Sequence, residues 1–180
     1  IEMANFSGRE IGILQSLREI PGFLAFSAVF ILVFIREQSF ALLSMLLLAL
    51  GVTITGFFPS ATGLYLTTIL MSVGFHYFET INQSLTLQWL SKEKSAHFMG
   101  RAMAVKGIAS VAAFGGIWLL VEQLDVSFKW IYMLFGGTAL VITLAASYTH
   151  LTLPTNSPVS ISVVAVYNKK TQKQSKTEIV

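Results

Sequence analysis

The sequence has no cysteine and few charged residues, and both shortages restrict its possible functions. The 180 residues contain no cysteine, which excludes disulfide bonds and thiol chemistry. Only 12% of the residues are charged, against about 25% in soluble domains, while 54% are hydrophobic. This composition predicts a membrane protein.

Basic charge is also sparse. The chain has 12 Lys and Arg against 9 Asp and Glu, and four lysines between Lys169 and Lys176 supply most of the excess. Nothing therefore indicates a nucleic-acid-binding groove, and nucleic acid is not an expected partner. The first ten residues have neither the basic start nor the apolar run of a signal peptide. Because the chain begins with Ile1, we expect the natural start to lie further upstream.

Long apolar segments predict an all-α fold built from membrane-spanning helices. A helix rises about 1.5 Å per residue and the apolar core of a bilayer is about 30 Å thick, so about 20 residues are needed for one span. Five segments meet this need with help from flanking residues. The result is a polytopic helix bundle over residues 1–146, surrounded by the lipid bilayer, with spans expected at 11–35, 40–58, 64–90, 98–121 and 130–146.

The connections between spans set the expected orientation. Arg36 and Glu37 follow the first span, and the third connection, Ser91–His97, reads as a charged, solvated loop. Arg101 and Lys106 lie early enough in the fourth span for their side chains to reach back to this loop. The other two connections carry less basic charge. The positive-inside rule therefore predicts that Arg36, Glu37, Arg101 and Lys106 are cytoplasmic loop charges, with the amino terminus outside and the carboxyl end inside.

A polar stripe runs along the third span. Its members recur every three or four residues and share one helix face: Thr68, Ser72, His76, Glu79, Gln83 and Thr86. Ionisable groups are costly in hydrocarbon, so this face should look into the protein or a water-filled cavity. Glu79, near the middle of the bilayer, is a candidate proton carrier. The predicted substrate or proton pathway comprises Ser72, His76, Glu79, Asn82 and Gln83, together with Arg18 and Glu19 from the first span.

Two interpretations of Arg18 and Glu19 are open. They belong either to exposed first turns from which they snorkel, or to the external mouth of a cavity shared with the Glu79 stripe. Arg18 lies about 9 Å along its helix and Glu79 about 22 Å along an antiparallel one, which argues against a direct pair. Nearby, Pro21 should kink the first span or free a backbone carbonyl.

The fourth span carries small residues at three- and four-residue spacing, which favours close packing against another helix. These residues are Gly100, Ala104, Gly107, Ala109, Ala112, Ala113 and Gly116.

The order of these elements resembles the amino-terminal half of a bacterial-type transporter of the major facilitator superfamily. The segments IGILQSLREIPGFLAF, FFPSATGLY and FMGRAMAVKGIASVAAFGG follow one another as in that family, and the resemblance covers roughly residues 7–146. It implies the second to sixth helices of a six-helix half. It also implies a secondary transporter fragment in the inner (plasma) membrane that moves a small solute, with possible proton coupling, by alternating access. The missing first helix and the carboxyl-terminal half would complete the substrate site.

Two family motifs are kept only in part. Where the family usually has Gly-x-x-x-Asp-Arg-x-Gly-Arg, residues Ile35–Ser39 keep one basic residue and one acid. Where the antiporter branch has Gly-x-x-x-Gly-Pro-x-x-Gly-Gly, residues Ala112–Gly116 keep the paired glycines and lack the proline. These departures weigh against a charge network at the first loop and against drug–proton antiport. The best matches are Gly100-Arg101 and Ile20-Pro21-Gly22.

The composition changes at Ser147, and we expect a non-helical tail over residues 147–180. Its first part, SYTHLTLPTN, looks like translated adapter sequence. The alternative is a native cytoplasmic linker to a second half.

Rival functions can be weighed from the polar residues. His76-x-x-Glu79 lacks the second histidine of a zinc motif, so neither an enzyme, a metal site nor a cofactor is expected. A non-transporting membrane scaffold stays open, because a polar stripe can also hold helices together. We expect the chain by itself not to transport, because alternating access needs two halves that rock around the substrate.

Overall fold

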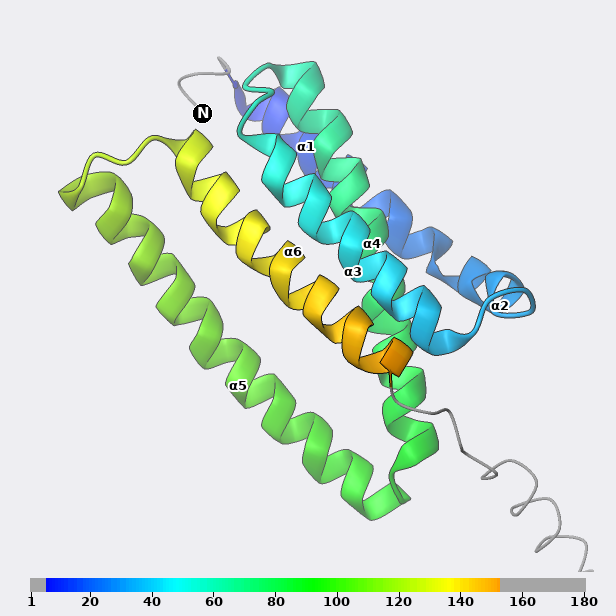
Figure 1. The fold of residues 1–180 in the computed structure, drawn as a ribbon. Helices are drawn as coiled ribbons and strands as arrows, with labels where there is room; N and C mark the ends of the chain where they lie inside the picture. Colours follow the sequence, from blue (N-terminus) through cyan, green and yellow to red (C-terminus); the bar gives the residue numbers. More distant parts are fainter. Residues whose placement is uncertain (1–5, 153–180) are drawn as a thin grey trace, which may run out of the picture. The chain divides into compact units, whose positions relative to one another are not determined.

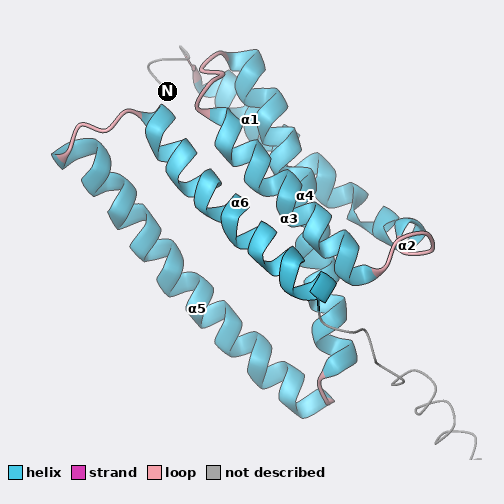
Figure 2. Ribbon diagram, in the orientation of Figure 1, coloured by secondary structure: helices cyan, strands magenta, loops and turns pink. Residues whose placement is uncertain are grey.

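The computed structural model describes residues 6–152 as helices joined by short connections (Figures 1 and 2). No strand occurs among these residues, so the all-α prediction is confirmed. The residues up to Ser147 belong to one compact unit, and the contacts below lie within it. The helices are α1 (Gly8–Leu24), α2 (Ala28–Ile31), α3 (Glu37–Thr55), α4 (Ala61–Trp89), α5 (Lys92–Trp118) and α6 (Phe128–Thr152).

Three helical segments in the described part of the chain are long and apolar enough to cross a membrane. They are Glu37–Thr55, Lys92–Gln123 and Phe128–Tyr148, which correspond to the spans predicted at 40–58, 98–121 and 130–146. α4 covers the span predicted at 64–90 and has 29 residues. It is not among the three because its polar stripe lowers its mean hydropathy.

The span predicted at residues 11–35 is not one continuous helix, and that prediction is wrong. α1 ends at Leu24, a 3₁₀ turn occupies Ala25–Ser27, and α2 ends at Ile31. Pro21 lies inside α1 and is buried, and the backbone tightens only after Leu24. The change of direction allows Ala28 to reach the core.

That core lies where α2 and α3 pack on α4. Ile81 is completely buried and contacts Ala28 and Phe40, which are 1% and 5% exposed. Next to them the Tyr77 ring lies 5.3 Å from the Phe40 ring, and its hydroxyl lies 2.7 Å from that of Ser27. α4 is therefore attached to both preceding helices through the side of Ile81 and Tyr77.

Single glycines mark the closest approaches of α3 to its neighbours. A Cβ added at Gly74 of α4 would lie 2.5 Å from both the Leu48 amide nitrogen and the Ser44 carbonyl oxygen of α3. A Cβ at Gly136 of α6 would collide with Thr53 of α3. Real Cβ atoms do not approach backbone so closely, and glycine is therefore required at these contacts.

α5 differs from its prediction in two ways. It begins at Lys92, so most of the predicted solvated loop Ser91–His97 is helical. The predicted close packing of its small residues is also wrong within the described residues: a Cβ at any of its four glycines would have nothing within 4 Å. α5 continues as a π-helical turn, Leu119–Gln123, before the chain reverses through Asp125.

α6 continues to Thr152, beyond the expected end at residue 146. The prediction of a non-helical tail is therefore wrong for residues 147–152. The rest of that predicted tail lies outside the described residues.

Candidate solute cavity and ion pair

A cavity of about 470 Å³ opens between α1, α3 and α4. α4 contributes one side of it because the stripe spacing of three and four residues places Thr68, Ser72 and His76 on one face. α1 contributes Arg18 and Glu19. The apolar part of the lining consists of Leu48, Met71 and Phe75.

The hydroxyl groups of Thr68 and Ser72 are available to a ligand. Their residues are only 8% and 3% exposed, yet neither hydroxyl bonds to any described residue. Thr67 and Thr86, also on α4, donate instead to the carbonyl four residues earlier. No fully enclosed side-chain nitrogen or oxygen among the described residues lacks a partner, so the Thr68 and Ser72 hydroxyls reach the open space of the cavity.

His76 lies against α1 at Gly22. A Cβ at Gly22 would be 3.0 Å from the His76 Cε1 atom, so glycine leaves the space that the imidazole occupies. The His76 ring also meets the Phe75 ring edge-on at 5.2 Å. Like the two hydroxyls, the imidazole has no hydrogen bond to a described residue, and its nitrogens are open to a ligand.

Arg18 and Glu19 form an ion pair at the cavity, with Arg18 Nη2 3.1 Å from Glu19 Oε1. Their side chains are 57% and 56% exposed, so water competes with this pair. The structure brings these two residues together with Ser72 and His76, but Glu79 is not part of the same lining.

Glu79 instead pairs with α5. Its Oε2 atom lies 3.5 Å from Lys106 Nζ, and Gln83 Nε2 donates to its Oε1 atom at 3.5 Å. The Lys106 ammonium also lies 5.3 Å from the centre of the Phe75 ring. The expectation that Lys106 reaches back toward the loop before α5 is therefore wrong. Lys106 lies about 21 Å along α5 from Lys92, too deep to reach that end.

The remaining predicted residues lie apart from the cavity. Asn82 and Gln83 are exposed on α4, and Arg36 is exposed just before α3. Glu37 begins α3 and accepts a hydrogen bond of 2.8 Å from Gln88 Nε2 at the end of α4. Arg101 lines a different cavity at the start of α5.

Two contacts were not predicted from the sequence: the ion pair of Lys106 with Glu79, and the packing of the His76 ring against Gly22. The depth of Lys106 in α5 was the available signal for the first. The match of Ile20-Pro21-Gly22 to a transporter helix drew attention to Gly22 but did not indicate its neighbour.

The described residues contain no group of three or more His, Asp or Glu side chains that could hold a metal ion. Comparisons with protein families, with curated proteins and with solved structures give no match. The cavity and the ion pair are therefore the features that bear on function.

Proposed function

We propose that this chain is part of a secondary transporter of the major facilitator kind, embedded in the inner (plasma) membrane, with its solute cavity between α1, α3 and α4. The observation that supports this most is the cavity itself. Its volume, about 470 Å³, falls within the range of small-molecule sites. The Thr68 and Ser72 hydroxyls and the His76 imidazole open into it and have no hydrogen-bond partner in the described part of the chain, which is costly unless water or a solute bonds to them.

The lining suits a small polar solute with an apolar part. Arg18 offers a cation and Glu19 an anion, both at the exposed side of the cavity. Deeper groups donate and accept hydrogen bonds, while Leu48 and Met71 offer apolar contact. Such a mixed lining binds by a few placed polar groups against an apolar wall.

The Glu79–Lys106 pair is the proposed coupling element. Phe75 connects this pair to the cavity, because its ring lines the cavity and also lies under the Lys106 ammonium. Protonation of Glu79 would leave the Lys106 charge without its counter-ion beside an aromatic ring. Within the described residues this pair is also the one polar side-chain contact between α4 and α5, so breaking it would free α5 to move.

Cysteine labelling tests whether the cavity contains water, as a transport pathway must. The natural chain has no cysteine, so each introduced thiol is the only one. We would place Ser72→Cys and, as control, Ile108→Cys in the full chain reconstituted in liposomes. Ile108 is 72% exposed and two residues from Lys106, hence at nearly the depth of Glu79 but facing outward. A membrane-impermeant thiol reagent should label Ser72→Cys quickly and Ile108→Cys hardly at all.

Protection by solutes extends the same test. A panel of sugars, amino acids, organic acids and amines is added before labelling, and one class should slow the labelling of Ser72→Cys in a saturable way. Equal labelling of both cysteines, with no protection by any class, would contradict a solute pathway. It would favour the rival function, a membrane scaffold in which the stripe only joins helices.

The coupling element is tested in the same Ser72→Cys background. Glu79→Gln or Lys106→Gln each leaves one charge unpaired, which should draw water into the bundle and speed labelling by about fivefold, the change expected for roughly 1 kcal/mol. Combining both changes removes the imbalance and should restore the original rate. Lys129→Gln is the matched control, because Lys129 also lies over an aromatic ring, that of Phe57 at 4.7 Å. A rate unchanged in both single variants would remove the pair from the mechanism.

A further inference from the structure

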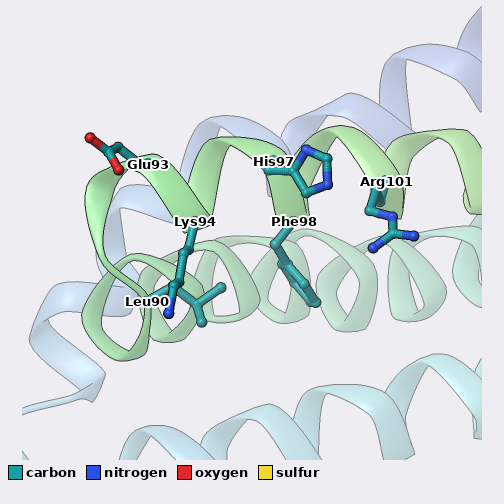
Figure 3. Close-up of a pocket in the computed structure, with 6 residues that line it drawn as sticks. All are labelled: Leu90, Glu93, Lys94, His97, Phe98 and Arg101. Atoms are coloured by element: carbon teal, nitrogen blue, oxygen red, sulfur yellow. The ribbon is translucent and has the colours of Figure 1, made fainter.

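A second cavity, of about 410 Å³, lies at the start of α5 (Figure 3). Lys94, His97 and Arg101 recur at three- and four-residue spacing and so share one face of the helix. Figure 3 shows Lys94 and Arg101 on the same side, with the Glu93 carboxylate directed away from them. The three nitrogen-bearing side chains therefore line one cavity, and its one acidic lining residue, Glu93, directs its carboxylate away from them (Figure 3).

Lys94 and Arg101 have no counter-ion within residues 6–152. Neither Lys94 nor Arg101 makes an ion pair or a hydrogen bond with any described residue, whereas Arg18 and Lys106 both have carboxylate partners. Two unpaired cations within two turns of helix repel each other and attract anions. A ligand with negative charge would relieve this repulsion.

The same cavity is bounded by apolar side chains. Leu90 and Phe98 line it, and Phe98 is 51% exposed. Trp89, at the end of α4, is 65% exposed, and tryptophan favours the interface between lipid and water. An anion that carries an apolar chain would satisfy both kinds of lining, and a free inorganic anion would satisfy only one.

The place of the cavity along α5 indicates the source of such an anion. The segment Lys92–Gln123 is long and apolar enough to cross a membrane, and the cavity lies at its charged end. Lys94 and Arg101 are about 10 Å apart along the helix axis, so their long side chains can reach the same head-group layer, which is about 5 to 8 Å deep. The positive-inside rule assigns this end to the cytoplasmic side, where anionic lipids are abundant.

We propose that this cavity binds the phosphate of an anionic phospholipid. Arg101 presents paired N–H groups to two phosphate oxygens, and Lys94 supplies a second positive charge. The imidazole of His97 donates a further hydrogen bond, and Phe98 and Leu90 lie along the first part of the acyl chain. This site depends on membrane insertion of α5 but not on the proposed transport.

The test is lipid binding to the full chain in neutral detergent micelles, counted by native mass spectrometry. Phosphatidylglycerol should bind about thirtyfold more tightly than phosphatidylcholine, given roughly a kilocalorie for each of the two basic residues at an anionic surface. Lys94→Gln with Arg101→Gln should reduce phosphatidylglycerol binding to the phosphatidylcholine level. Lys92→Gln is the matched control. It removes the same charge from the same turn, but two residues rotate the side chain by about 200° around the helix, and Lys92 does not line the cavity.

Three results would overturn the proposal. The first is equal binding of the two lipids, and the second is an equal loss in the Lys92→Gln control. The third is competition by millimolar inorganic phosphate as effective as that by the lipid, which would indicate a soluble ligand. If circular dichroism shows that the double variant does not fold, Lys94→Gln and Arg101→Gln are measured singly, and each should weaken phosphatidylglycerol binding about fivefold while phosphatidylcholine binding stays the same.

Discussion

Gly74 faces the backbone of α3, and Gly74→Ala tests whether this contact holds α3 and α4 together. The added Cβ would lie 2.5 Å from backbone atoms of Ser44 and Leu48, whereas carbon makes its best contacts at about 3.5 to 4.0 Å. Both neighbours belong to a helix backbone and cannot rotate away. The two helices must therefore separate by about 1 Å, which forfeits roughly a quarter to a half of the dispersion attraction there.

The size of the effect follows from two opposing terms. Forcing an extra carbon into a packed contact costs about 1 to 3 kcal/mol. Alanine also favours the helical state over glycine by about 1 kcal/mol. Gly107→Ala isolates the second term, because Gly107 lies on an exposed face of α5 where a Cβ meets nothing within 4 Å. We expect Gly107→Ala to stabilise the helix slightly, and Gly74→Ala to be about 2 kcal/mol less stable than this control.

A buried thiol reports the separation of the two helices. Thr55→Cys places the thiol on α3 at a residue that is 3% exposed, next to Met71 of α4 and away from Gly74. Its reaction with a thiol reagent in detergent measures the population in which α3 and α4 have opened. A difference of about 2 kcal/mol makes this population roughly thirtyfold larger in Gly74→Ala than in Gly107→Ala. If the two variants react at the same rate, the close approach of α3 and α4 is not what holds them together.

Two further predictions concern polar contacts of α1 and of the turn after it. The Ser7 hydroxyl, the amide of Glu10 itself and the Ser7 amide hold the pKa of the Glu10 carboxyl below its usual value. The stability that these hydrogen bonds give to the folded state is present above the unfolded pKa of Glu10 and is lost as pH falls through its folded pKa. Amide exchange in the first turn of α1 should therefore rise below about pH 4. Ser7→Ala should move the onset to higher pH, and an unmoved onset would contradict the role of Ser7. Tyr77→Phe removes the hydrogen bond to the Ser27 hydroxyl and should lower the free energy of unfolding by about 1 kcal/mol, or Tm by roughly 3 °C. Adding Ser27→Ala should cost little more, since both changes delete the same hydrogen bond.

The positions of the helices are the part of the fold that the sequence predicts best. Apolar length and the Pro59 turn locate both ends of α3 and α4 and the start of α6 to within about three residues, because each of these helices carries a long, mostly apolar segment next to turn or charged residues. Pro21 indicates a kink in the first span, but not that the regular helix ends after Leu24. Hydropathy over residues 11–35 is the same for a straight helix and a broken one, and Ala28, after the break, packs with Phe40 and Ile81 in the core. Local sequence does not contain that tertiary contact.

Small residues show the same division between local pattern and tertiary contact. The repeated glycines and alanines of α5 match a known packing motif, yet its glycines face open space within the described residues. Two of the tight contacts between helices occur at Gly74 and Gly136. Neither has a small residue four positions away, since Leu70, Phe78, Tyr132 and Leu140 stand there. Close approach depends on the surface of both helices, and a sequence pattern in one helix describes only its own side of the contact.

The prediction for Lys106 was wrong because the start of α5 was predicted at Phe98 instead of Lys92. When the charged stretch before Phe98 is treated as a loop, Lys106 lies about 12 Å from the helix start, a depth from which a long side chain can return to water. Ser91 precedes Lys92 and Glu93 in the pattern of a helix start, with a small polar residue first and an acid in the first turn, and the structure begins α5 there. Counted from Lys92, the same ammonium lies about 21 Å inside, where a cation needs a counter-ion. Glu79 is the one acid in α4, so placing the helix start correctly would have been enough to predict the ion pair.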